Sequence, residues 1–182
     1  ENLIASFPSS KIIYISTDYV FEGNRGNYSE YDLAKPQTVY GKTKLQAEKL
    51  LTEKDVNNFC VIRTSAIYDN DASFIKFLNT ELSKGNAVSA FVDVKYSPTW
   101  ILDFVSAVKE IIEKDFNEKI LHICGDAITR YEFACIYAKV AGYSEDQILI
   151  GYSSNKNFFF RDLSLINRRS KSLFSYQPTP HQ

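Results

Sequence analysis

Residues 11–51 read KIIYISTDYVFEGNRGNYSEYDLAKPQTVYGKTKLQAEKLL, and this stretch decides the fold. It opens with the apolar, β-branched run of residues 11–16, which is typical of a strand buried in a parallel sheet. A loop punctuated by Gly23 and Gly26 follows, and the last part has the spacing of an amphipathic helix. The order is strand, loop, helix. We expect the helix to pack on the sheet through Val39, Thr43, Ala47 and Leu50.

Three side chains of this stretch can meet at the end of the strand. Tyr40 and Lys44 are four residues apart, so on a helix they lie on one face about a turn from each other. Thr17 ends the strand and can present its hydroxyl to the same space. A phenol beside an ammonium, with a hydroxyl that holds a carbonyl oxygen, is suited to protonating that oxygen. The Tyr-x-x-x-Lys pattern occurs three times in the chain, but only this match lies on a predicted helix after a strand ending in Ser-Thr.

The run Ser-Thr-Asp-Tyr-Val-Phe at positions 16–21 is the most selective motif of the stretch. With the residues that accompany it, the chain resembles the extended short-chain dehydrogenase/reductase superfamily and, within it, the dTDP-4-dehydrorhamnose reductase family. That resemblance implies NAD(P)H-dependent reduction of a 4-keto nucleotide sugar, with Tyr40 as proton donor. The accompanying residues are Gly23, Gly26, Tyr28, Glu30, Asp32, Pro36, Tyr40, Gly41, Lys44 and Glu48.

The resemblance also implies which residues bind what. The cofactor is NADP or NAD, and the partner is a nucleotide-sugar substrate. The implied catalytic residues are Thr17, Tyr40 and Lys44, and the implied cofactor-binding residues are Tyr40, Lys44, Ser16 and Ser65. The implied substrate-binding residues are Thr17, Asp18, Ala66, Pro98, Thr99 and Arg161.

Three positions depart from the family pattern. Ala66 stands where the family has a tryptophan that packs against the sugar, residues 93–96 (DVKY) replace the usual Asp-Gln-x-Gly, and Asp162 replaces a proline. These departures leave two alternatives open. One is a non-catalytic homologue that binds a nucleotide sugar or dinucleotide, as the regulatory subunit of methionine adenosyltransferase resembles this family. The other is a nucleotide-sugar epimerase or dehydratase, against which residues 16–21 speak.

The order of elements predicts an α/β fold. A second strand, residues 59–65, follows the helix and completes a crossover unit. We expect a Rossmann-like doubly wound parallel sheet, of which this chain holds the later strands only, plus a small C-terminal α/β substrate-binding lobe. Residues 1–70 are assigned to the C-terminal part of the dinucleotide-binding domain, and residues 71–182 to the remaining sheet elements and the lobe.

Further elements follow from local signals. Helices are predicted over residues 72–84, ending at Gly85, and over residues 100–114, and strands over residues 88–94 and 120–124. A capping box at residues 129–132 opens a helix that runs to Gly142. His122 is predicted to be a structural histidine with satisfied hydrogen bonds.

Composition excludes several classes of function. A net charge of −1 without a long basic run argues against a nucleic-acid partner. No apolar run approaches the ~20 residues of a membrane span, so we expect no membrane contact and a cytoplasmic protein. The three cysteines lack paired spacing, which favours reduced core thiols and no metal site. A homodimer is left open.

The cofactor-binding glycine turn of the superfamily is absent. None of the seven glycines forms a Gly-x-x-Gly-x-x-Gly motif, which seats the cofactor pyrophosphate on a helix N-terminus. We therefore expect the sequence to be the C-terminal part of a longer protein and to be inactive on its own. We also expect the strand at residues 11–16 to have an open edge.

Overall fold

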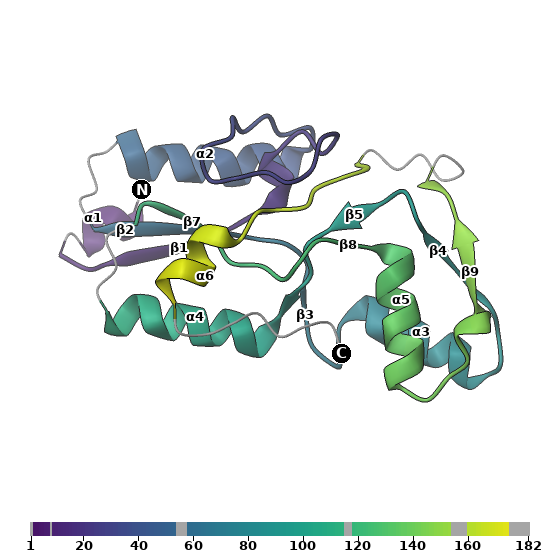
Figure 1. Ribbon diagram of the computed structural model, residues 1–182. Helices are drawn as coiled ribbons and strands as arrows, with labels where there is room; N and C mark the ends of the chain where they lie inside the picture. The colour runs from purple at the N-terminus through teal and green to yellow at the C-terminus, as the bar shows by residue number, and fades with distance from the viewer. Residues whose placement is uncertain (1, 8, 54–57, 115–117, 154–159, 175–182) are drawn as a thin grey trace.

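The computed structural model describes residues 2–7, 9–53, 58–114, 118–153 and 160–174. A parallel three-stranded sheet has the order β1-β2-β7, formed by β1 (Ile12–Thr17), β2 (Phe59–Thr64) and β7 (Ile120–His122). Helices α2 (Val39–Glu53) and α4 (Ile101–Glu113) cover its two faces (Figure 1). The predicted mixed α/β fold with parallel strands is confirmed. The division at residue 70 stays a prediction.

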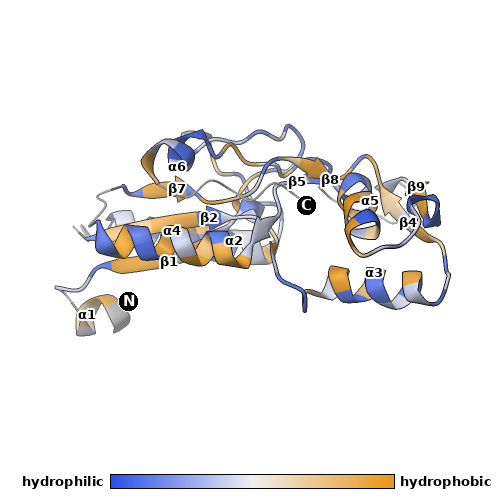
Figure 2. Cartoon of the chain, turned by 60° about the horizontal axis from the view of Figure 1, so that its bottom comes forward, coloured by the Kyte–Doolittle hydropathy of each residue, from blue (hydrophilic) through white to orange (hydrophobic). Residues whose placement is uncertain are grey.

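The central strand β2 carries the core of this sheet. All six of its residues are buried, and Figure 2 shows β1 and β2 as largely hydrophobic strands. One face of β2 packs against apolar side chains of α4. Burial of such side chains contributes roughly 1.5–3 kcal/mol each. The cluster consists of Cys60, Ile62, Phe104, Ala107, Ile111, Leu121, Ile123 and Phe174.

Helix α2 packs on the sheet through a different face from the predicted one. Val39 is 80% exposed and Thr43 is exposed, whereas Gly41, Glu48 and Leu51 are buried. The reason is a close backbone approach. A Cβ on Gly41 would lie 2.1 Å from the Tyr19 carbonyl oxygen, so only glycine can occupy this contact. The glycine therefore faces inward and turns Val39 and Thr43 toward solvent, whereas Ala47 and Leu50, further along the predicted face, are half-buried.

A second group of elements lies at the other end of the molecule (Figure 1). Strands β4 (Val88–Phe91) and β9 (Ile148–Gly151) pair in parallel, and helices α3 (Ser73–Ser83) and α5 (Arg130–Val140) pack with them around Leu78, Leu82 and Ala134. The predicted capping box is confirmed, because Thr129 and Glu132 bond reciprocally at the start of α5. Gly85 follows α3 with φ +78, as expected of a C′ residue.

Short elements join the two groups. Strands β5 (Lys95–Tyr96) and β8 (Ile128–Thr129) pair antiparallel, and β3 (Ile67–Tyr68) pairs in parallel with β6 (Thr99–Trp100). The remaining elements are α1 (Asn2–Ser6), η1 (Asp18–Val20), η2 (Glu145–Gln147) and α6 (Arg168–Leu173).

Two predicted strands are too long. The strand predicted over residues 88–94 ends at Phe91, because the Asp93 carboxylate accepts hydrogen bonds from Ser153 and bends the chain. The strand predicted over residues 120–124 ends at His122, because the backbone N–H of Gly125 donates to the Pro98 carbonyl and the chain leaves the ladder.

Strand β1 is an edge strand within the described part of the chain, where β2 is its one partner. Ile15 on this strand is 45% exposed, so the expectation that both faces of β1 are covered is not met there. The three cysteines are free, as predicted. Cys60 and Cys124 are buried, and burial raises the pKa of the Cys60 thiol to about 11.

Candidate active site

The carboxyl ends of β1 and β2 meet at Thr17 and Thr64, which pair in register. Thr17 is only 7% exposed and begins the turn η1. Its Oγ1 donates to Asp18 Oδ1 at 3.0 Å and accepts the backbone N–H of Tyr19 at 3.3 Å. Parallel sheets bind ligands at this end of their strands.

Asp18 is a buried carboxyl held by two hydroxyls. Ser65 Oγ donates to its Oδ2 at 2.5 Å, opposite the bond from Thr17. Burial raises the pKa of Asp18 to about 6, although these hydrogen bonds and the Arg130 charge oppose the shift. Ser65, predicted to bind the cofactor, therefore uses its hydroxyl to orient Asp18.

Tyr40 and Lys44 lie side by side on α2, as predicted. The Lys44 ammonium is 5.8 Å from the centroid of the Tyr40 ring and donates to the Ile15 carbonyl at 3.0 Å. Tyr40 is 54% exposed, and its ring lies edge-on to Tyr19 at 5.9 Å. The ammonium is thus tied to the end of β1, beside an accessible phenol.

A cavity of about 260 Å³ brings most of these groups together. Five residues predicted from the sequence line it, and Arg130 and Lys95, which no sequence motif indicated, add two cationic side chains. The lining comprises Thr17, Asp18, Tyr19, Tyr40, Ser65, Ala66, Val94, Lys95, Tyr96, Arg130, Phe160 and Leu163.

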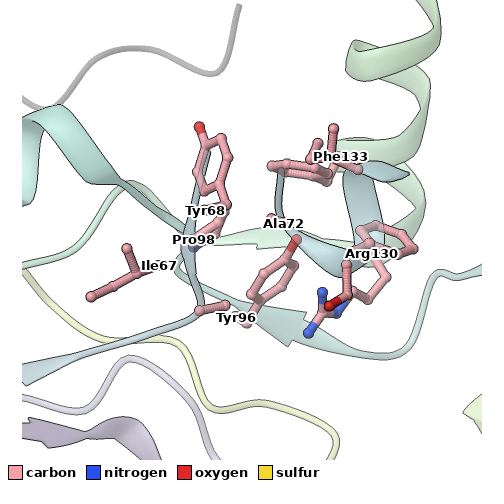
Figure 3. Close-up of a pocket in the computed structure, with 11 residues that line it drawn as sticks. Ile67, Tyr68, Ala72, Tyr96, Pro98, Arg130 and Phe133 are labelled. Carbon is pink, nitrogen blue, oxygen red and sulfur yellow. The ribbon is translucent and has the colours of Figure 1, made fainter. Parts of the chain in front are cut away.

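A second cavity of about 160 Å³ adjoins the first and shares Ala66, Tyr96 and Arg130 with it. Figure 3 shows its labelled aromatic side chains, Tyr68, Tyr96 and Phe133, grouped with Arg130. The Arg130 guanidinium lies 3.9 Å from the centroid of the Tyr96 ring, so the aromatic face holds this cation between the two cavities.

The other residues predicted to bind substrate or cofactor lie in different surroundings. Pro98 lines the second cavity. Thr99 is buried, and its hydroxyl donates to the Ser65 carbonyl at 2.7 Å. Ser16 donates to Glu48 at 2.5 Å, which engages the hydroxyl predicted to bind the cofactor. Arg161 is exposed and lies outside both described cavities, near Asp93, whose pKa its charge helps to lower.

His122 is buried, but its ring is not satisfied as predicted. Neither ring nitrogen makes a hydrogen bond within the described chain, although backbone groups of Tyr28 and Ile166 lie nearby. Burial and the neighbouring Arg63 charge lower the pKa of His122 to about 3. The imidazole is therefore neutral at ordinary pH. Its ring packs at 78° to that of Phe21, with the ring centroids 5.8 Å apart.

Known proteins resemble this chain along most of its length. Residues 4–157 match the RmlD substrate binding domain. The methionine adenosyltransferase 2 subunit beta of Rattus norvegicus is 31% identical over 138 residues, covering 70% of this chain and 41% of the relative. The dTDP-4-dehydrorhamnose reductase of Aggregatibacter actinomycetemcomitans is 31% identical over 134 residues, covering 69% and 45% respectively.

Solved structures agree on the fold. A crystal structure of dTDP-4-dehydrorhamnose reductase from Bacillus anthracis in complex with NADP superposes with a TM-score of 0.83 at 22% identity. The superposition covers 94% of this chain and 62% of the Bacillus anthracis chain.

Two negative findings concern the described residues. They form no group of His, Cys, Asp and Glu side chains that could hold a metal ion. None of the helices in the described ranges is both long and apolar enough to cross a bilayer.

This chain spans less than half the length of the two curated relatives above. With the match covering residues 4–157, the chain belongs to the RmlD substrate binding domain family, as its resemblance to the dTDP-4-dehydrorhamnose reductases had indicated.

Proposed function

We propose that the complete protein containing this chain reduces a 4-keto nucleotide sugar with NADPH or NADH. The observation that carries the proposal is the convergence of Thr17 and Tyr40 on one cavity, with the Lys44 ammonium 5.8 Å from the Tyr40 ring. Relatives and structural neighbours named as dTDP-4-dehydrorhamnose reductases support the substrate class.

The side chains have distinct tasks in this reaction. Tyr40 donates its phenolic proton to the ketone oxygen, and the product is a secondary alcohol. Lys44 stabilises the phenolate that remains, because an ammonium favours a nearby negative charge. Thr17 donates its hydroxyl proton to Asp18 in the structure, so it holds the ketone oxygen only once that proton turns from Asp18 Oδ1 to the substrate. These tasks are orientation and proton supply.

The cofactor fits this site at its nicotinamide end. The Lys44 ammonium lies at the carboxyl end of β1, beside the accessible phenol, and is suited to holding a ribose hydroxyl. When bound, the cofactor supplies the hydride that reaches the ketone carbon. The choice between NADP and NAD follows from groups that bind the adenine ribose.

A Tyr40→Phe variant of the complete protein tests the proposal. Reduction of a panel of 4-keto nucleotide sugars is followed by nicotinamide absorbance. We expect turnover to fall roughly 10²–10⁴-fold, because a positioned acid is lost, and cofactor affinity to stay nearly unchanged. Tyr152→Phe, at an exposed tyrosine away from both cavities, is the matched control and should keep parental turnover. Parental turnover in Tyr40→Phe would refute the assignment.

A second candidate is a non-catalytic regulatory protein on the same fold. The curated relatives named methionine adenosyltransferase 2 subunit beta, at 31% identity, favour it. The two functions separate in one experiment. A complete protein that binds NADPH but reduces no sugar of the panel, in parental and Tyr40→Phe forms alike, would favour the non-catalytic function over the reductase.

A further inference from the structure

A buried ion pair joins α2 to the sheet behind the candidate site. Arg63 Nη2 donates to Glu48 Oε2 at 2.7 Å, and Arg63 Nε lies 3.2 and 3.3 Å from the two carboxylate oxygens. Both side chains are 5% exposed. The paired contacts fix the direction as well as the distance between helix and strand.

A third element is tied to the same carboxylate. Ser16 Oγ donates to Glu48 Oε1 at 2.5 Å. Ser16 directly precedes Thr17, and Arg63 lies two residues before Ser65, which holds Asp18. Glu48 therefore connects α2 to the two strand ends that carry the groups of the site.

Glu48 also shares a helix face with the candidate catalytic pair. It lies four residues after Lys44, which lies four residues after Tyr40, so the three side chains follow one another along α2. Any rotation or sliding of α2 that moves Glu48 from Arg63 also moves the phenol and the ammonium relative to Thr17.

Stability alone is a poor reason for such a pair. Removing two charges from water costs about as much as their attraction returns, so buried pairs are often replaced by apolar residues without loss of stability. Arg63 carries a further cost, because its Nη1 is buried without a hydrogen-bond partner within the described residues. The pair is better explained if it fixes the position of α2 relative to the sheet.

We propose that Glu48 and Arg63 are positioning residues that set Tyr40 and Lys44 against Thr17. This inference rests on the proposed function and assigns to the buried pair the placement of its proton donor. Neither residue lines the two cavities, so they act through α2 and the strand ends.

Three variants of the complete protein test the inference. Glu48→Gln breaks the pair and leaves Arg63 buried without its counter-charge. The double variant Glu48→Leu with Arg63→Met removes both charges. Leu51→Ala is the matched control, because Leu51 is buried on the same helix one turn later, in an apolar cluster with Phe59 and Val61. Each variant is measured for thermal stability, kcat, KM and amide hydrogen exchange.

We expect Glu48→Gln to lower kcat at least tenfold with KM changed less than twofold. The double variant should regain stability but not kcat, and Leu51→Ala should lose stability while keeping kcat within twofold. A double variant that regains kcat, or a Leu51→Ala variant that loses kcat as strongly as Glu48→Gln, would overturn the inference.

Amide hydrogen exchange tests the positioning role without relying on turnover. Exchange of residues 39–44 should be faster in the double variant than in Leu51→Ala at equal stability, because the pair and not general packing holds this turn. Equal exchange rates would overturn the inference. If Tyr40→Phe keeps parental turnover, the proposed function fails, whereas the exchange comparison still decides whether the pair positions α2.

Discussion

Replacing Gly41 by alanine tests how closely α2 must approach the end of β1. The Cβ of an alanine at this position would lie 2.1 Å from the Tyr19 carbonyl oxygen, 2.9 Å from its carbon and 3.0 Å from Pro36 Cβ. Ordinary contacts between heavy atoms are about 3.5–4.0 Å. The helix and η1 must therefore separate by roughly 1 Å, since a backbone carbonyl cannot rotate away as a flexible side chain can.

Two opposing effects decide the change in stability. Alanine is favoured over glycine inside a helix by about 1 kcal/mol. Overpacking a tight contact costs about 1–3 kcal/mol. We expect a net loss of up to about 2 kcal/mol in the free energy of unfolding. The effect on turnover is larger, because Tyr40 precedes the substituted residue and a misplacement of about 1 Å costs roughly 10²-fold.

Urea unfolding measures the first effect, and sugar-dependent oxidation of NADPH by the complete protein measures the second. Lys42→Ala is the control, since this neighbouring side chain is exposed and its removal should change stability by less than about 0.5 kcal/mol. A Gly41→Ala protein that is more stable than the parent and turns over at the parental rate would refute the close-contact reasoning.

Two further predictions concern Asp18 and the isolated chain. Burial raises the pKa of Asp18 to about 6, above its unfolded value, so its stabilising contribution is present at low pH and falls by about 2 kcal/mol as pH rises from about 4 to 6. Urea unfolding of Asp18→Asn should lack that decline, and parallel pH profiles of variant and parent would contradict the assignment. Residues 1–182 alone should not bind NADPH tightly, because a single ammonium at Lys44 cannot replace the backbone donors of a glycine turn; saturable nicotinamide fluorescence at micromolar concentration would show otherwise.

Local pattern was sufficient to predict the strand, the loop and the helix that bring Tyr40 and Lys44 together. The reason is physical: the i to i+4 spacing and the end of a buried strand are set by backbone geometry over a few residues. The capping box at Thr129 and the helix end at Gly85 were predictable for the same reason. Each depends on hydrogen bonds or dihedral angles within one turn.

Features that depend on distant parts of the chain were not predictable in this way. The packed face of α2 was predicted wrongly at Val39 and Thr43, because the approach of Tyr19 to Gly41 and the pairing of Glu48 with Arg63 override apolar periodicity. From the sequence, Arg130 was recognised only as a residue within the capping box at residues 129–132. Its stacking on Tyr96 requires β5 and β8 to pair, which no local pattern encodes.

Two of the three departures from the family pattern, at Ala66 and in residues 93–96, lie in one part of the site. Ala66 and Tyr96 line both cavities and flank Arg130, whereas Thr17, Tyr40 and Lys44 keep the family residues. Ala66 also has φ +31, a left-handed conformation that a bulky side chain adopts at a cost of about 1–3 kcal/mol. Departures in the cavity walls, with Thr17, Tyr40 and Lys44 kept, favour the proposed reductase with an altered substrate choice over the non-catalytic alternative.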